Sequence, residues 1–349
     1  MKMKRRKLSE QVEEKLAKEP EEKSQYDGKD ITVSTGSTLL DLAVSGGRFR
    51  EGGIPLGILV EIFGPSGTGK TVLLSQLAAN LQRLGGKVMF HDPEARLNKQ
   101  FARIFGLDTG EIEYTIPNTI PEVFQSVRDW VSQEEADKGT IYGVFADSLA
   151  ALSTDMEMGE GDKMGMRRAK EFSEELRKTC RIITQRNVLM VCSNQIRQNL
   201  DAGPYGMKYK SPGGEAIGFY SSLRLRFGSP QKIKEKRKIR SKEHERVVGV
   251  HTEIEVFKSS VWKPYRTAEV YILFDYGIDD IRANLRFLKT NTGSTVYTIK
   301  DLKLDRSLER SIQIVEEENL EQELRNAVIE LWNEIEEGFQ EKRKPKVFW

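Results

Sequence analysis

The sequence of 349 residues contains few of the side chains that build covalent or metal frameworks, with two cysteines and three histidines. Cys180 and Cys192 are too few for a disulfide framework or a structural zinc site, so we expect two reduced thiols in a cytosolic protein. Three histidines cannot build a histidine-rich metal centre. No run approaches the roughly 18 apolar residues that a membrane span requires, and we expect no membrane partner.

An excess of charge of one sign is also absent. Lys and Arg number 55 against 53 Asp and Glu, a net charge of +2, so any basic surface must be local. Residues 1–24 begin with a basic stretch that no apolar segment follows, which excludes a secretory signal and favours a cytoplasmic location. Their sparse apolar positions predict either a solvated helix that needs a partner surface or a disordered segment.

Short apolar runs alternate with longer amphipathic segments between residue 34 and about residue 275. Four runs are continuously apolar and separated by helix-length stretches, which predicts buried parallel strands. These runs are 56–64, 86–92, 142–148 and 187–194. Three later runs alternate apolar with polar residues and lack intervening helices, which predicts an antiparallel extension. They are 221–228, 252–257 and 268–274. The whole pattern predicts an α/β fold with right-handed crossovers.

The composition changes after Asp279. Apolar positions between Ile314 and Ile335 lie near helical spacing, which predicts one long acidic helix over about residues 307–338. We therefore expect three parts: an N-terminal helical, oligomerising segment (1–33), an α/β core (34–279) and a small α+β C-terminal domain (280–349).

A phosphate-binding loop follows the first buried run. Residues 64–71 match G-x-x-x-x-G-K-[ST], between an apolar strand and an amphipathic helix. Glycines let the backbone N–H groups curl toward phosphate oxygens, Lys70 supplies a cation to the β- and γ-phosphates, and the Thr71 hydroxyl can ligate Mg²⁺. The sequence therefore predicts a nucleoside triphosphate site. Its residues are Gly64, Pro65, Ser66, Gly67, Thr68, Gly69, Lys70 and Thr71.

Polar residues at the ends of other predicted strands belong with this loop. Asp147 can hold Mg²⁺ through water, although it can instead cap the following helix. Glu94 can orient or deprotonate an attacking water, with Asp92 as the competing candidate. Gln195 can contact a γ-phosphate or can simply be a turn residue.

Two long glycine-rich segments, 156–168 and 195–214, lack a core pattern, which indicates functional loops or mobile solvated ones. Both mix cations with apolar or aromatic residues, the combination that single-stranded nucleic acid requires. These residues are Met164, Arg167, Arg168, Arg197, Tyr205, Lys208, Tyr209 and Lys210.

In their order and spacing, these motifs closely resemble the bacterial RecA recombinase family, from about Ser34 to Ile278. The most specific part is NQIR (194–197), followed about sixteen residues later by a GG–FY segment. The resemblance implies a RecA-type P-loop ATPase core with a mostly parallel sheet and a DNA-dependent ATPase using ATP and Mg²⁺. It further implies a helical filament of copies of this chain on single-stranded DNA, which pairs with homologous duplex and exchanges strands.

The resemblance also assigns roles. Glu94 takes the water-activating role and Gln195 that of the γ-phosphate sensor, while Phe101 and Phe274 match aromatic positions around the adenine. The two glycine-rich segments match the family's DNA-binding loops. Met164 is then an apolar wedge in the first loop, and Gly213 and Gly214 belong to the second.

Departures from the family pattern concern the contact between subunits. The family carries two lysines that reach the neighbouring subunit's ATP; Lys258 matches the first, and Ser260 replaces the second. Lys263 is near enough in sequence to substitute. Gly218 stands where the family commonly has a lysine. Gly218 and Ser260 therefore keep open one alternative, a hydrolysis-poor mediator that binds DNA and partner proteins. A ring-forming ATPase or motor, which shares the fold but lacks the NQIR and GG–FY pairing, is the other.

A basic stretch at 231–246 is longer than usual for the family. It holds eight Lys or Arg against three Glu. It is either a solvated hairpin turn or a secondary site for duplex DNA.

Overall fold

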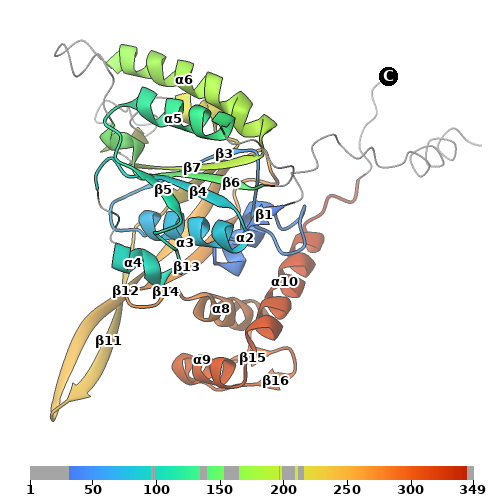
Figure 1. The fold of residues 1–349 in the computed structure, drawn as a ribbon. Coiled ribbons are helices and arrows are strands. Elements are labelled where there is room, and N and C mark those ends of the chain that lie inside the picture. Colours follow the sequence, from blue (N-terminus) through green and yellow to red (C-terminus); the bar gives the residue numbers. More distant parts are fainter. Residues whose placement is uncertain are drawn as a thin grey trace, which may run out of the picture.

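The computed structural model describes residues 31–95, 97, 99–133, 140–152, 165–195, 197–198, 209–210 and 216–343. The predicted N-terminal segment therefore lies outside the described residues, apart from its last three. In the described part of the chain, a ten-stranded sheet forms the centre of the molecule (Figure 1).

The larger part of this sheet is parallel, with neighbours in the order β10, β3, β7, β6, β4, β5. The strands are β3 (Leu59–Gly64), β4 (Lys87–His91), β5 (Ile112–Thr115), β6 (Tyr142–Ala146), β7 (Val188–Gln195) and β10 (Leu223–Phe227). The four predicted buried parallel strands are confirmed as β3, β4, β6 and β7. The short strand β5 was not predicted, because its side chains are half-buried or exposed and form no apolar run.

Helices cover both faces of the sheet (Figure 1). They are α2 (Thr38–Ser45), α3 (Lys70–Arg83), α4 (Lys99–Ile104), α5 (Ile120–Gln133) and α6 (Gly165–Gln185). Successive side chains of a strand point to opposite faces, so a strand covered on both sides must be apolar throughout. Leu59 and Met89 accordingly pack under α5 and α6, whereas Val60 and Phe90 join the cluster beneath α2 and α3.

The antiparallel edge begins one strand later than the sequence predicts. It consists of β12 (Lys242–Ser259), β13 (Thr267–Leu273), β14 (Gly277–Ile278) and β11 (Gln231–Ile239). The strand β10 was expected to be antiparallel, but it lies parallel to β3 and antiparallel to β12. The alternation of polar and apolar residues in β10 suggested a strand with one face in solvent. Arg224 instead pairs with buried Glu61 of the neighbouring strand β3, at 2.6 Å.

The C-terminal segment contains α8 (Asp280–Thr292), β15 (Thr298–Ile299), β16 (Leu302–Lys303), α9 (Leu308–Glu317) and α10 (Glu321–Gly338). The prediction of one helix over 307–338 is therefore wrong. Ser307 caps α9, and the helix stops where Asn319 adopts a left-handed φ of 55°. Asparagine tolerates that conformation better than other non-glycine residues, so the break carries no proline or glycine signal.

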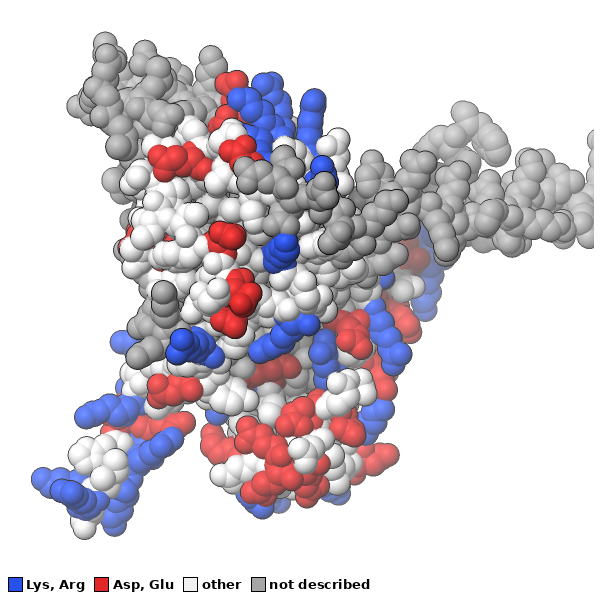
Figure 2. All heavy atoms as spheres, in the orientation of Figure 1, with Lys and Arg blue, Asp and Glu red and all other residues white. Residues whose placement is uncertain are grey.

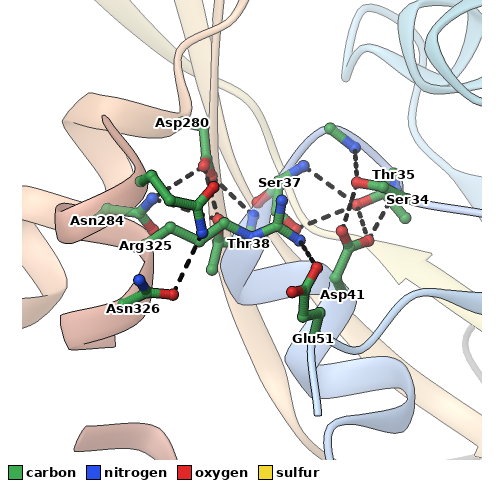
Figure 3. Close-up of polar contacts among 12 residues, drawn as sticks. Ser34, Thr35, Ser37, Thr38, Asp41, Glu51, Asp280, Asn284, Arg325 and Asn326 are labelled. Atoms are coloured by element: carbon green, nitrogen blue, oxygen red, sulfur yellow. Dashed lines mark hydrogen bonds and ion pairs between the residues drawn. The ribbon is translucent and has the colours of Figure 1, made fainter. Parts of the chain in front are cut away.

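A buried polar cluster attaches α8 to α2 (Figure 3). Asp280 accepts hydrogen bonds from the Thr38 N–H and hydroxyl, both at 2.7 Å, and from Asn284 at 2.8 Å. Nearby, Arg325 of α10 lies 3.7 Å from Glu51. These contacts, together with one buried apolar cluster that spans both parts, place the C-terminal segment against the core.

The sequence predicts no membrane span and two reduced cysteine thiols. No helix in the described ranges combines the length and the apolar character that crossing a membrane demands. Cys180 is half-buried and Cys192 is buried, and both are free thiols. Burial raises the pKa of the Cys180 thiol to about 11, which disfavours the reactive thiolate.

Candidate functional site

The glycine-rich loop joins the end of β3 to the start of α3. Gly69 has φ +96°, and a Cβ there would lie 2.2 Å from Ile272 Cδ1, so only glycine fits. Gly69 is also the N-cap of α3 and supplies no side chain to the first helical N–H groups. Unfilled N–H groups at a helix start favour an anion, so the loop is built as a phosphate cradle.

Lys70 holds its ammonium group at the centre of this cradle. Nζ donates hydrogen bonds to the Gly64 carbonyl at 3.0 Å and the Pro65 carbonyl at 2.6 Å. The side chain is buried, and desolvation lowers the Lys70 pKa, while the charge of Asp147 acts in the opposite direction. A weakly hydrated cation inside a ring of backbone dipoles suits the β- and γ-phosphates of a nucleotide.

Asp147 joins the loop to the neighbouring strands. The Thr71 hydroxyl donates to Asp147 Oδ2 at 2.5 Å, and the Ser193 hydroxyl donates to Oδ1. The alternative that Asp147 caps a helix is wrong: Ser148 is the N-cap of the following short 3-10 helix (Leu149–Ala151), and no side chain caps it. Thr71 and Asp147 therefore form the oxygen pair that a nucleotide-bound Mg²⁺ would meet.

Glu94 and Asp92 follow β4 but have different surroundings. Glu94 is half-buried and lines the pocket beside the glycine-rich loop. Asp92 is fully buried and accepts from the Leu97 N–H at 2.6 Å and the Tyr114 hydroxyl at 2.9 Å. Desolvation of the Tyr114 phenol, together with its bond to Asp92 and the Asp92 charge, raises the Tyr114 pKa to about 12. Of the two carboxylates, Glu94 lines this pocket and Asp92 does not.

Strand register places Gln195 at the glycine-rich loop, because Gln195 pairs with Gly64 across the parallel β3–β7 ladder. Ser193 lies two residues earlier on the same face, a signal that the sequence reasoning missed. The pocket has a volume of about 300 Å³. It is lined by Ser66, Gly67, Gly69, Lys70, Thr71, Val72, Glu94, Asp147, Ser148, Ser193, Gln195, Val250, Ile272 and Phe274.

The two predicted adenine-contacting rings have different outcomes. Phe274 lines the pocket and is 44% exposed, so its ring is available to a planar base. Phe101 belongs to α4, and the structure does not describe its side chain. The pocket also has apolar walls, Val250 and Ile272, that the sequence reasoning did not single out.

Lys258 does not line this pocket. Lys258 pairs with Arg224 on β10, which pairs with Glu61 on β3, so it lies two strands away from β3 and about 10 Å along the strand direction before Gly64. Its ammonium group donates to the carbonyls of Gly218 at 2.8 Å and Phe219 at 2.9 Å, in helix α7 (Ala216–Tyr220). Burial lowers the Lys258 pKa, and the neighbouring Arg224 lowers it further. Lys258 thus belongs to the opposite end of the sheet.

The residues near Lys258 that depart from the family pattern have contacts that explain them. A Cβ at Gly218 would lie 3.0 Å from Arg224 Nη1, so a larger side chain would crowd that guanidinium. The Ser260 hydroxyl donates to the Ser222 carbonyl at 3.1 Å. Lys263 is 3.1 Å from Glu336 of α10 and lies over the Trp262 ring. Lys263 is therefore engaged within its own chain.

The predicted DNA-contacting residues border the undescribed segments. Arg167 and Arg168 lie in the first turn of α6, and β8 (Arg197–Gln198) pairs with β9 (Tyr209–Lys210), setting Arg197 opposite Lys210. The side chains of these residues are not described. Outside the described residues lie Met164, Tyr205, Lys208, Gly213 and Gly214.

Comparisons with known proteins agree with this arrangement. The family model of the RecA N-terminal domain matches residues 9–279. Protein RecA of Anaplasma marginale (strain Florida) is 34% identical over 271 residues, which are 76% of this chain and 68% of that protein. Protein RecA of Campylobacter jejuni subsp. doylei is 30% identical over 293 residues, 82% of this chain and 80% of that protein. The chain therefore belongs to the RecA family.

Proposed function

We propose that this protein is an ATP-dependent DNA strand-exchange protein. It polymerises on single-stranded DNA with ATP·Mg²⁺ between adjacent subunits and pairs that filament with homologous duplex. The observation that carries the proposal is one of connectivity: the chain passes from Gln195, beside the phosphate loop, directly into the second DNA-binding segment. That segment leads into α7, whose carbonyls hold Lys258. Nucleotide, DNA and a neighbouring subunit are thereby linked by one continuous stretch of chain.

Each group at the pocket has a distinct role in this proposal. Lys70 and the loop N–H groups bind the β- and γ-phosphates, and Thr71 and Asp147 hold the Mg²⁺ that the nucleotide brings. Among the residues described, no three His, Cys, Asp or Glu side chains cluster into a metal site. A Mg²⁺ held mainly by phosphates, one hydroxyl and one carboxylate through water fits that donor set. Glu94 activates the attacking water, and Gln195 contacts the γ-phosphate and transmits its presence.

Lys258 acts on the neighbouring subunit in this proposal. Its ammonium group bonds to α7 and does not line its own pocket, whereas a head-to-tail polymer would bring one subunit's exposed end to the next subunit's pocket. Phe219, whose carbonyl accepts from Lys258, is 77% exposed, as a residue at a contact between subunits would be in a single chain.

The test combines two assays on the full chain: ATP hydrolysis stimulated by single-stranded DNA, and D-loop formation with homologous duplex. We expect both activities, and Lys70→Ala should lose both. Gln195→Ala should still bind ATP but lose the stimulation by DNA, because the contact that reports the γ-phosphate is gone. Wild-type protein that forms no D-loop and is not stimulated by DNA would overturn the proposal.

The missing second lysine favours one alternative, a hydrolysis-poor mediator. Ser260 carries no charge and Lys263 is paired with Glu336, so each interface supplies one cation fewer than the family pattern. A mediator would bind single-stranded DNA with ATP and show neither turnover nor D-loops. The same two assays separate the two functions.

A further inference from the structure

A short turn after β4 carries Glu94, and hydrogen bonds fix its backbone. The Ala95 N–H donates to the Asp92 carbonyl at 3.0 Å, which closes a β-turn. Such turns favour Asp at the first position and Pro at the second, as Asp92 and Pro93 are here, and Glu94 takes the third. Ala95 then has a φ of 50°, which is uncommon for a non-glycine residue. The position of the Glu94 carboxylate therefore depends on the contacts that hold this turn.

Asp92 holds the turn through its side chain. Figure 2 shows Asp and Glu gathered on the surface of the C-terminal helices, whereas Asp92 is 1% exposed. A buried carboxylate is costly unless hydrogen-bond donors surround it. Two donors meet Asp92 Oδ2: the Leu97 N–H at 2.6 Å and the Tyr114 hydroxyl at 2.9 Å. The chain before and after Glu94 is thus held by one carboxylate.

Tyr114 supplies its hydroxyl from β5, the last strand at this edge of the described sheet (Figure 1). The residue is 39% exposed, while its hydroxyl reaches a buried acceptor. With its pKa raised to about 12, the phenol stays protonated and remains a donor to Asp92. Tyr114 does not line the nucleotide pocket, so any effect that it has on hydrolysis must pass through another residue.

The attachment of β5 to the sheet does not depend on this hydroxyl. The strands β4 and β5 pair in parallel at four register positions, and the Asp92 N–H donates to the Thr115 carbonyl at 2.9 Å. The Thr115 hydroxyl also lies 2.6 Å from Nδ1 of buried His91. Removal of the Tyr114 hydroxyl should therefore leave the strand in place and loosen only the turn.

We propose that Tyr114 is a positioning residue for ATP hydrolysis, which acts through Asp92 to hold the turn that carries Glu94. The inference rests on the proposed function for the role of Glu94 as the group that activates water. A general base must lie within hydrogen-bond reach of the proton that it removes, and a misplacement of about 1 Å can cost roughly 10²-fold in rate. The phosphates meet other elements, the glycine-rich loop and α3, so Tyr114 should influence the chemical step and not the affinity for ATP.

The test is the kinetics of Tyr114→Phe in the full chain, a change that removes the hydroxyl and keeps the ring. Hydrolysis of radiolabelled ATP is measured with saturating oligo(dT), and a non-hydrolysable ATP analogue is titrated separately. We expect kcat to fall roughly 10-fold, while the affinity for the analogue stays within roughly 2-fold of the wild type. Tyr297→Phe is the matched control, because it removes a phenol hydroxyl in the C-terminal segment and keeps the ring beneath Lys289. It should retain wild-type turnover.

A double-mutant cycle separates positioning from a structural role. If Tyr114 acts only through Glu94, adding Tyr114→Phe to Glu94→Gln should not lower the residual turnover further. A hydroxyl that only stabilised the fold would lower the urea midpoint of both proteins and leave the kcat of the folded protein unchanged. Urea unfolding of all four proteins in the cycle therefore accompanies the kinetics.

An unchanged kcat in Tyr114→Phe overturns the inference, whatever happens to the urea midpoint. So does a loss of turnover that is equally large in the Glu94→Gln background, since Tyr114 then acts through another group, such as Asp92 itself. The strand-exchange function fails separately, if the wild type shows neither DNA stimulation nor D-loops. In that case a basal turnover that falls in Tyr114→Phe, and falls no further when Tyr114→Phe is added to Glu94→Gln, still supports the positioning role.

Discussion

The two ends of the same sheet are built differently. At the nucleotide end, Thr71, Asp147 and Ser193 come from three different elements and bond to one another within one chain. At the other end, Lys258 bonds to two backbone carbonyls of α7, next to the exposed ring of Phe219. Under the proposed function, this difference predicts that a single chain binds ATP, whereas fast hydrolysis requires the assembled polymer.

The largest expected effect is the loss of ATP binding at the nucleotide end. Lys70→Ala should weaken ATP binding by roughly 10³-fold, because two charge-assisted contacts to the phosphates are lost. Titration with a fluorescent ATP analogue measures the change, and Lys303→Ala, an exposed lysine elsewhere, is the matched control. Equal affinity for the ATP analogue in Lys70→Ala and the control would contradict phosphate binding by this loop.

The next effect separates chemistry from binding at the same end. Glu94→Gln should retain ATP and DNA binding while hydrolysis falls by roughly 10²-fold, the scale of a lost general base. Asp92→Asn is the comparison, since Asp92 holds Tyr114 and Leu97 and does not line the pocket. Normal ATP turnover in Glu94→Gln, together with loss of turnover in Asp92→Asn, would assign the role of general base to Asp92.

The opposite end is expected to govern turnover alone. Lys258→Ala should lower DNA-dependent turnover by roughly 50-fold, and Ser260→Lys should raise it roughly 5-fold. The apparent ATP affinity should hardly change in either, because the contact forms mainly in the transition state. If Ser260→Lys leaves turnover flat while Lys263→Ala abolishes it, Lys263 already provides the second cation.

The last prediction concerns a buried carboxylate near neither end, where we expect a change in stability and the smallest change in activity. Burial raises the Asp41 pKa from 3.8 to about 6, although hydrogen bonds from Ser34 and Thr35 partly offset this (Figure 3). The folded chain then binds the proton more tightly than the unfolded chain, so this contribution to stability is full below pH 4. It is lost as the pH rises through 6, by up to about 3 kcal/mol.

Asp41→Asn removes that dependence while keeping an oxygen acceptor for the Thr35 N–H. Urea unfolding at pH 4 and pH 7 should therefore show the variant gaining on the wild type as the pH rises, with hydrolysis unchanged. A constant difference between the two proteins at both pH values would contradict the buried, proton-binding state of Asp41.

Local signals predicted the nucleotide end well. The glycine spacing and the doubly buried strands are encoded within short windows, because a strand covered on both faces must be apolar throughout. Arg224 and Glu61 are 163 positions apart, so no short stretch of sequence reveals their pairing or that β10 is parallel to β3. The break at Asn319 rests on one residue that tolerates positive φ, and the helical pattern continued across it. The different burial of Glu94 and Asp92 depends on how the chain packs after β4, which the two neighbouring sequence positions do not reveal.

The central claim is that one subunit's Lys258 completes the site that its neighbour's Glu94 serves, and mixing two inactive variants tests it most directly. Lys258→Ala keeps the pocket, and Glu94→Gln keeps the donor lysine. In an equimolar mixed filament on single-stranded DNA, turnover should recover to roughly a quarter of the wild type, because half the sites keep Glu94 and half of their neighbours keep Lys258. Turnover that stays at the mean of the two variants would contradict the account.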